Sequence, residues 1–115
     1  MALQDLQREI RDFARARDWE KFHTPKNLAM ALSVEAAELL EQFQWLSPDE
    51  SQELDSEKLR AVSHEMADVL IYLVRLGDVL GIDLSQVARE KLAINEQRYP
   101  AERVSGSAKK YSEYE

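Results

Sequence analysis

Apolar residues recur at three- and four-residue spacing along most of the chain, which is the period of helices that bury one face. This pattern predicts four main helices over about residues 3–17, 25–46, 57–80 and 84–99. The string Ser47-Pro48-Asp49-Glu50 has serine at the N-cap and glutamate at N3, so it predicts a short additional helix that opens on a capping box. Residues 101–115 are polar and lack an apolar period, and we expect a tail or a lid there.

Residues that favour strands are scarce. Twelve of the 115 residues are β-branched, which is too few for several strands. We therefore expect an all-α protein, a four-helix bundle with one short extra helix. Its helical domain would cover residues 1–100, and the polar tail or lid would cover residues 101–115.

Composition and charge exclude several functions. The chain has no cysteine, so neither disulfides nor thiolate zinc sites can form. A net charge of -7 argues against binding to the backbone of polymeric nucleic acid. No apolar run approaches the ~18 residues that a membrane span requires, and the residues after Met1 lack the features of a secretory signal. We expect a cytoplasmic protein without a membrane partner.

Acidic residues interrupt two otherwise apolar helices. Glu35 and Glu38 lie within the apolar run 28–40, while Glu65 and Asp68 lie within the run 65–74. At 100° per residue, this spacing places both members of each pair on one helix face, one turn apart. Antiparallel packing of the two helices would bring the four carboxylates together, and like charges at that distance require a cation. Oxygen ligands in this number favour Mg²⁺, with Mn²⁺ as a substitute.

The four carboxylates have two alternative explanations. They could line solvated helix faces, although their neighbours in the sequence are mostly apolar, whereas a solvated stripe is normally bordered by polar residues. They could also belong to a ferritin-like di-iron bundle, which needs a Glu-x-x-His on each of two helices. The chain has this spacing once, at Glu20 and His23, ahead of Pro25. That single copy argues against iron.

Aromatic and basic residues accompany the acidic pairs. Trp45 continues the face of the first pair, and Tyr72 continues the face of the second. In the fourth helix Lys91, Asn95 and Arg98 share a face and present hydrogen-bond donors that suit phosphate oxygens. The alternatives are core filling for the aromatic rings and a solvated surface for the basic residues.

In these features the chain resembles the MazG-like, all-α nucleoside triphosphate pyrophosphohydrolases. The hallmark of that family is a Glu-x-x-Glu on one helix and a Glu-x-x-Asp on a later one, which the two acidic pairs reproduce. Within the superfamily the chain looks most like the dCTP pyrophosphatases, over about residues 10–111. The strings that carry this resemblance are Arg17-Asp18-Trp19-Glu20-Lys21-Phe22-His23, Phe43-Gln44-Trp45, Gln97-Arg98-Tyr99-Pro100 and Gly106-Ser107-Ala108.

The resemblance implies a role for each matching residue. Glu35, Glu38, Glu65 and Asp68 would be the magnesium ligands, and Glu38 or Glu35 would activate the attacking water. The residues implied in binding the nucleoside, sugar and phosphates are Trp19, Glu20, Lys21, Phe22, His23, Trp45, Tyr72, Lys91, Asn95, Arg98 and Tyr99. Three further residues would belong to a tail that covers the site, namely Ser107, Lys110 and Tyr111.

The implied reaction is magnesium-dependent hydrolysis of dCTP, and of 5-modified dCTP, to dCMP and pyrophosphate by attack of water at the α-phosphorus. Such an activity would sanitise the nucleotide pool. The alternatives are a house-cleaning pyrophosphohydrolase that acts on several (d)NTPs or on dUTP, and a non-catalytic helical interaction module. The apolar stretch 66–76 is more than one small bundle can cover. Together with the resemblance, it predicts a homodimer or a homotetramer.

Overall fold

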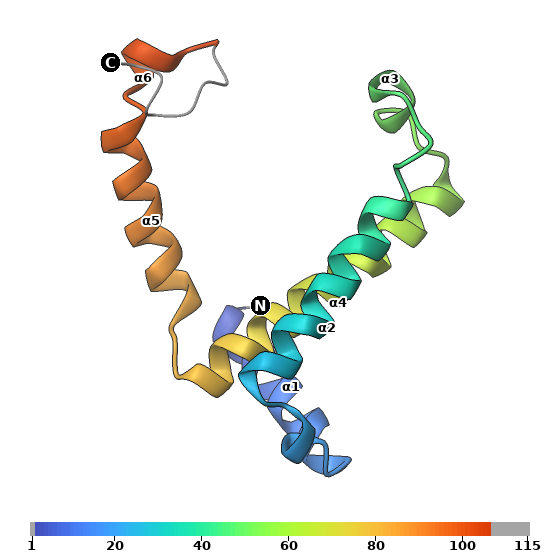
Figure 1. The fold of residues 1–115 in the computed structure, drawn as a ribbon, viewed down its shortest axis with the longest axis vertical. Coiled ribbons are helices and arrows are strands. Elements are labelled where there is room, and N and C mark those ends of the chain that lie inside the picture. The colour runs from blue at the N-terminus through green and yellow to red at the C-terminus, as the bar shows by residue number, and fades with distance from the viewer. Residues whose placement is uncertain (1, 107–115) are drawn as a thin grey trace. The chain divides into compact units, whose positions relative to one another are not determined.

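The computed structural model describes residues 2–106, and every regular element in this part of the chain is helical (Figure 1). The all-α prediction is therefore confirmed. The elements are α1 (Leu3–Ala16), the 3₁₀ turn η1 (Glu20–Phe22), α2 (Pro25–Glu41), α3 (Pro48–Ser51), α4 (Ser56–Leu80), α5 (Leu84–Arg98) and α6 (Ala101–Val104).

Capping residues start the helices where the sequence indicated. The Thr24 hydroxyl accepts a hydrogen bond from the Asn27 backbone N–H at 3.2 Å, and Pro25 occupies the first turn of α2. At α3 the capping box is complete, because the Glu50 N–H donates to Ser47 Oγ at 3.1 Å and Glu50 Oε1 accepts from the Ser47 N–H at 2.9 Å. These side chains satisfy backbone donors that have no partner inside the helix.

The second helix is shorter than predicted, since α2 ends at Glu41 rather than near Leu46. Beyond it the backbone tightens into turns, in which Phe43 N–H donates to Leu40 O at 2.9 Å and Leu46 N–H donates to Phe43 O at 2.9 Å. The residue that precedes a proline avoids the helical conformation, and Pro48 follows closely. This early end means that residues 42–46 do not continue the helical face of the acidic pair.

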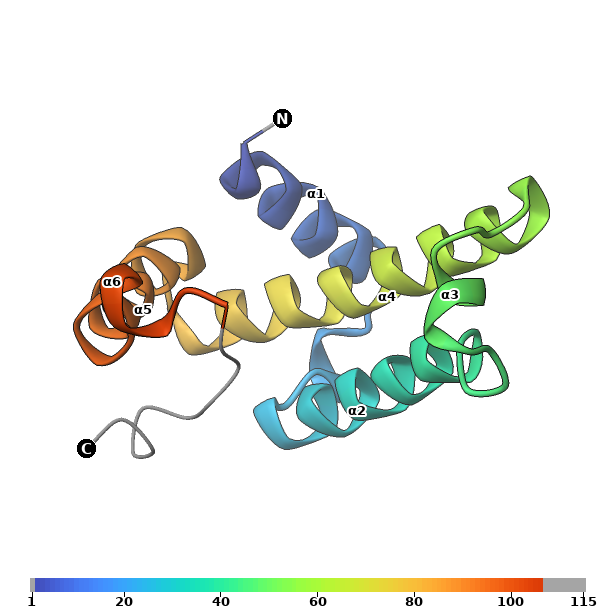
Figure 2. The same ribbon diagram turned by 90° about the horizontal axis from the view of Figure 1, so that it is seen from above.

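The first compact unit of the chain, which extends to Ile82, is built from α1, α2 and α4. Helices α2 and α4 run antiparallel, side by side, and α1 packs against α4 (Figures 1 and 2). Their shared core is small, because the buried hydrophobic residues among those described are Ala14, Leu28, Val62 and Val74. The antiparallel pair is the scaffold that places the acidic residues of one helix opposite those of the other.

Helix α5 belongs to a second compact unit, which begins at Asp83. The predicted bundle of four long helices is therefore not formed within the first unit, which contains three of them. Lys91 interrupts the stripe of Leu84, Val87 and Ile94 along α5, and the helix has no buried residue. The domain division predicted at residues 100 and 101 stays a prediction. None of the described helices combines the length and hydrophobicity needed to cross a membrane.

Gly81 ends α4 in the left-handed conformation, with φ of 70°. Gly81→Ala is expected to lower the free energy of unfolding by about 1 kcal/mol, because a Cβ disfavours positive φ although nothing lies within 4 Å of it. Gly81→Asn is the matched control and should lose less, since asparagine tolerates this conformation. Urea unfolding measures both variants. An alanine variant as stable as the wild type would contradict the role of the backbone angle.

Candidate metal centre and nucleotide site

The two acidic pairs face each other across the antiparallel helices. Glu35 and Glu38 lie on α2, Glu65 lies on α4, and each of the three is half-buried. One carboxylate oxygen from each lies within 4.8 Å of the corresponding oxygens of the other two. The i,i+3 spacing within α2 and the side-by-side packing on α4 produce this convergence (Figure 2).

Asp68 does not belong to this group of three, although it lies next to it. Its negative charge contributes to raising the pKa of both Glu35 and Glu65, so it is close enough to act on them. Three of the four predicted ligands therefore converge directly, and the fourth lies on the same helix face as Glu65, one turn further along α4.

Burial and mutual repulsion raise the pKa values of two carboxylates in the cluster. Burial, followed by contact with Glu38 and its charge, raises the pKa of Glu35 to about 7. The pKa of Glu65 is also raised, first by burial and then by the Glu38 charge. Both shifts have the sign expected for carboxylates that lack a cation.

Two buried oxygens in the cluster are without hydrogen-bond partners. Among the described residues, Glu35 Oε2 and Glu65 Oε2 are the buried side-chain polar atoms with none. Buried polar atoms are normally paired, and an unpaired one indicates a missing ion or water. Several hard carboxylate oxygens in one place fit a divalent cation such as Mg²⁺ or Mn²⁺, so the residues present suit the metal that the sequence predicts.

Aromatic rings gather at the end of α1. Trp19 packs edge-to-face against Phe13, with ring centroids 5.7 Å apart, and the Arg17 guanidinium lies 3.6 Å from the centre of the Phe13 ring. Trp19 and Phe22 both remain exposed. These rings therefore offer open surface on which a flat ligand could stack.

The polar members of the 19–23 string have local partners. Glu20 Oε1 pairs with Arg15 Nε at 2.6 Å, and Lys21 Nζ pairs with Asp18 Oδ2 at 2.9 Å, both at exposed positions. The two pairs connect η1 to Arg15 at the end of α1 and to Asp18 after it.

The remaining predicted site residues lie in different parts of the chain. Trp45 lies beyond the end of α2 and is 87% exposed, whereas Tyr72 is half-buried on α4, one turn after Asp68. The residues on α5 and its C-cap belong to the second unit, and these are Lys91, Asn95, Arg98 and Tyr99. Ser107, Lys110 and Tyr111 lie outside the described residues.

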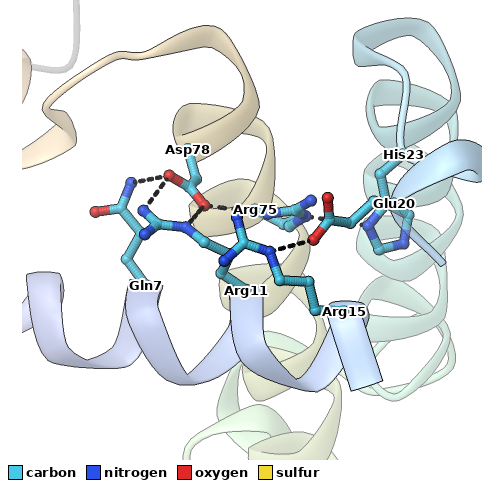
Figure 3. Close-up of polar contacts among 7 residues, drawn as sticks. All are labelled: Gln7, Arg11, Arg15, Glu20, His23, Arg75 and Asp78. Atoms are coloured by element: carbon cyan, nitrogen blue, oxygen red, sulfur yellow. Dashed lines mark hydrogen bonds and ion pairs between the residues drawn. The ribbon is translucent and has the colours of Figure 1, made fainter. Parts of the chain in front are cut away.

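A second polar cluster was not predicted from the sequence. It joins Gln7 and Arg11 of α1 to Arg75 and Asp78 of α4, and it reaches His23 ahead of α2 (Figure 3). A signal for it was present, because Arg75 and Asp78 interrupt an apolar helix at i,i+3 spacing just as Glu65 and Asp68 do.

An all-α chain in which Glu-x-x-Glu and Glu-x-x-Asp meet between two adjacent helices has the features that define the MazG-like proteins. The model of the MazG-like family matches residues 30–114. The chain belongs to this family, and the resemblance found in the sequence is confirmed.

Individual relatives agree with this assignment. The chain is 44% identical over 113 residues to dCTP pyrophosphatase 1 of Mus musculus and 42% identical over 113 residues to that of Homo sapiens. Each alignment covers 96% of this chain and 66% of the relative, so the chain spans about two thirds of the relatives' length. The crystal structure of a pyrophosphatase from Archaeoglobus fulgidus aligns with a TM-score of 0.80 and 46% identity, over 84% of this chain and 91% of that one.

The raised pKa of Glu35 predicts that wild-type and Glu35→Gln protein differ in stability, and that this difference depends on pH when a chelator removes metal ions. Above its folded pKa of about 7 the charged Glu35 destabilises the folded state, and this cost disappears as the pH falls through 7 toward the ordinary value of 4.5. In EDTA, Glu35→Gln should therefore melt higher than the wild type at about pH 8, and the difference should narrow toward about pH 5.

Thermal unfolding across this pH range measures the difference. Glu57→Gln, at the start of α4, controls for the loss of one carboxylate outside the cluster. A difference between Glu35→Gln and wild type that stays constant with pH would contradict the electrostatic account of the cluster.

Proposed function

We propose that this protein is a divalent-metal-dependent nucleoside triphosphate pyrophosphohydrolase that converts dCTP to dCMP and pyrophosphate. The observation that carries the proposal is the convergence of carboxylates from α2 and α4, two of which, Glu35 and Glu65, also have a buried oxygen without a hydrogen-bond partner. The names of the relatives, dCTP pyrophosphatase 1, support a nucleotide substrate of this kind.

Charge balance explains why a metal would be needed. A nucleoside triphosphate brings roughly four negative charges, and two unit charges 4 Å apart repel by about 4 kcal/mol at an effective dielectric of 20. A cluster that is already negative would exclude such a substrate. Glu35, Glu38, Glu65 and Asp68 would hold divalent ions, which when bound offset the phosphate charge and lower the pKa of a bound water.

The reaction would form one bond and break one. The oxygen of water attacks the α-phosphorus, and the bond from that phosphorus to the bridging oxygen breaks to release pyrophosphate. Glu38 would orient the water and accept its proton, and Glu35 is the alternative base. Both residues lie on α2 within reach of the same cluster, so the proton would leave from the side of α2.

The nucleoside would lie against the aromatic residues. Trp19 and Phe22 offer exposed rings, and Trp45 and Tyr72 would contribute two further rings. Stacking recognises a flat base but discriminates weakly against one added methyl group, which is worth ~1–3 kcal/mol. We therefore include 5-modified dCTP among the substrates. The resemblance to the family further implies that Lys91, Asn95, Arg98 and Tyr99 bind the sugar or phosphates.

A substrate panel with pyrophosphate detection tests the activity. In magnesium we expect turnover of dCTP and, within a hundredfold in kcat/KM, of 5-methyl-dCTP. Glu38→Gln and Asp68→Asn should each lower kcat by roughly a hundredfold or more, because they remove groups that act at the reacting phosphate. Glu57→Gln is the matched control and should retain activity. Folded Glu38→Gln or Asp68→Asn protein with most of the wild-type turnover would contradict the assignment.

We further propose that the chain assembles as a homodimer or homotetramer. Helices α2 and α4 leave large apolar side chains exposed, with Val34 at 56%, Leu40 at 64% and Met66 at 57% exposed. Isolated apolar residues on a surface are ordinary, but a series of them along two adjacent helices indicates a covered face. A second copy of the chain would cover it.

Light scattering after size exclusion measures the assembly. At micromolar concentration we expect a mass of at least twice 13.3 kDa. Met66→Glu should shift the elution toward the monomer, because it places a charge in the covered face. Exposed Arg60→Glu on the same helix is the control. A wild-type protein that elutes as a monomer would refute the proposal.

A further inference from the structure

Five polar side chains form a connected network at the junction of α1, α4 and the loop that precedes α2 (Figure 3). Arg11 donates two hydrogen bonds to the Asp78 carboxylate, from Nε at 2.8 Å and from Nη2 at 2.7 Å. Gln7 Nε2 donates a third at 3.0 Å. Arg75 Nη1 donates to Asp78 Oδ2 at 3.1 Å, and Arg75 Nε donates to His23 Nδ1 at 3.0 Å.

Burial makes the arrangement of Arg75 specific. Arg75 is 6% exposed, and among the described residues it is the only charged one that is buried. A buried charge must be paired, and Asp78 supplies the counter-charge from one turn further along the same helix. Hydrogen bonding from Arg11 holds the pKa of Asp78 below its ordinary value, so the counter-charge is maintained. Arg75 is thereby fixed, and its Nε–H is aimed at the histidine.

The chemistry of arginine determines the state of His23. A guanidinium group has donors and no acceptor, so His23 Nδ1 must accept and cannot carry a proton. The neutral ring then carries its proton on Nε2. Burial, and then the charge of Arg75, lower the pKa of His23, while Glu20 acts in the opposite direction. Glu20 is itself paired with Arg15, which weakens that opposition.

The backbone at His23 is held as well. Its N–H donates to Glu20 O at 3.1 Å in the turn η1, and Thr24 next to it caps α2. Asn27 Nδ2 donates to the carbonyl of Phe22 at 3.1 Å. The ring is therefore constrained from its own loop and from α4, and the Nε2–H donor has a defined position.

The distance along α4 suits a nucleotide. Arg75 follows Asp68 by seven residues, on nearly the same face, and Glu65 by ten, which places it about 10–15 Å along the helix from these carboxylates. This is close to the length of a nucleoside. A substrate with its phosphates at the acidic cluster would thus bring its base to the neighbourhood of His23 and the exposed rings of Trp19 and Phe22.

We propose that Arg75 is a positioning residue that fixes His23 as a hydrogen-bond donor through Nε2, and that this donor selects cytosine over uracil at ring atom N3. The unprotonated N3 of cytosine accepts such a bond, whereas the N3–H of uracil would face it donor to donor. The proposal rests on the proposed function, since it assigns the base specificity of the same site.

The tautomer is measured without any substrate. The chain has two histidines, so an untagged His64→Gln protein reports on His23 alone in a two-bond ¹H–¹⁵N spectrum. We expect a protonated Nε2 and an unprotonated Nδ1 at neutral pH. A ring protonated on Nδ1, or doubly protonated at pH 7, would overturn the proposal even if every Arg75 variant failed to fold.

Substitution of Arg75 tests whether this residue fixes the tautomer of His23. Arg75→Met preserves length and removes the donor, so the two neutral tautomers should mix and the pKa of His23 should return toward 6.5. Arg60→Met removes an exposed arginine from the same helix and should change neither. A His23 ring that keeps its Nε2–H form in folded Arg75→Met protein would overturn the role of Arg75.

Kinetics test the consequence for base choice. The ratio of kcat/KM for dCTP to that for dUTP should fall roughly tenfold in Arg75→Met and stay unchanged in Arg60→Met. A purely structural role would lower both values together and leave the ratio intact, which would contradict base selection. If the wild type hydrolyses no dCTP, the proposed function fails, and base selection fails with it. The spectrum would still decide whether Arg75 fixes the ring.

Discussion

Repulsion among the carboxylates between α2 and α4 is the constraint on which the site depends. Each acidic residue lies on an apolar helix, and the antiparallel packing that forms the core also forces Glu35, Glu38 and Glu65 together. The cost of this arrangement is visible in the raised pKa of Glu35 and in two buried oxygens without partners. A bound divalent cation would relieve both at once, so binding of the metal and stability of the helix pair would be linked.

Helix α4 carries two charged systems that are balanced in opposite ways. At the acidic cluster the carboxylates repel one another, and their raised pKa values mark charge that is not offset. Two turns later the Asp78 carboxylate is paired within the chain, with Arg75 and with Arg11. The first system is therefore open to a ligand, whereas the second is closed and serves to orient a neighbouring side chain. The different roles follow from the presence or absence of an internal partner rather than from burial alone.

Local signals predicted much of this protein from its sequence. The helix starts at Thr24, Ser47 and Asp83 are encoded by single side chains, and the i,i+3 acidic pairs identified the face on which the candidate site lies. Contacts between segments that are distant in the sequence could not be predicted in this way. The early end of α2 depends on turns ahead of Pro48, and the partners of Arg75 come from α1 and from the loop before α2. No periodicity within one helix reveals which residues a distant segment will bring to it.

Helix α4 is uninterrupted over 25 residues, so it fixes the spacing between the acidic residues and Arg75. Adding one residue between Asp68 and Arg75 would lengthen that interval by only about 1.5 Å but would swing everything beyond it by 100°. Asp68 and Arg75 would then no longer lie on nearly the same face of α4. Insertions and deletions in this interval are therefore restricted to nearly whole helical turns, whereas single substitutions leave its length and register unchanged.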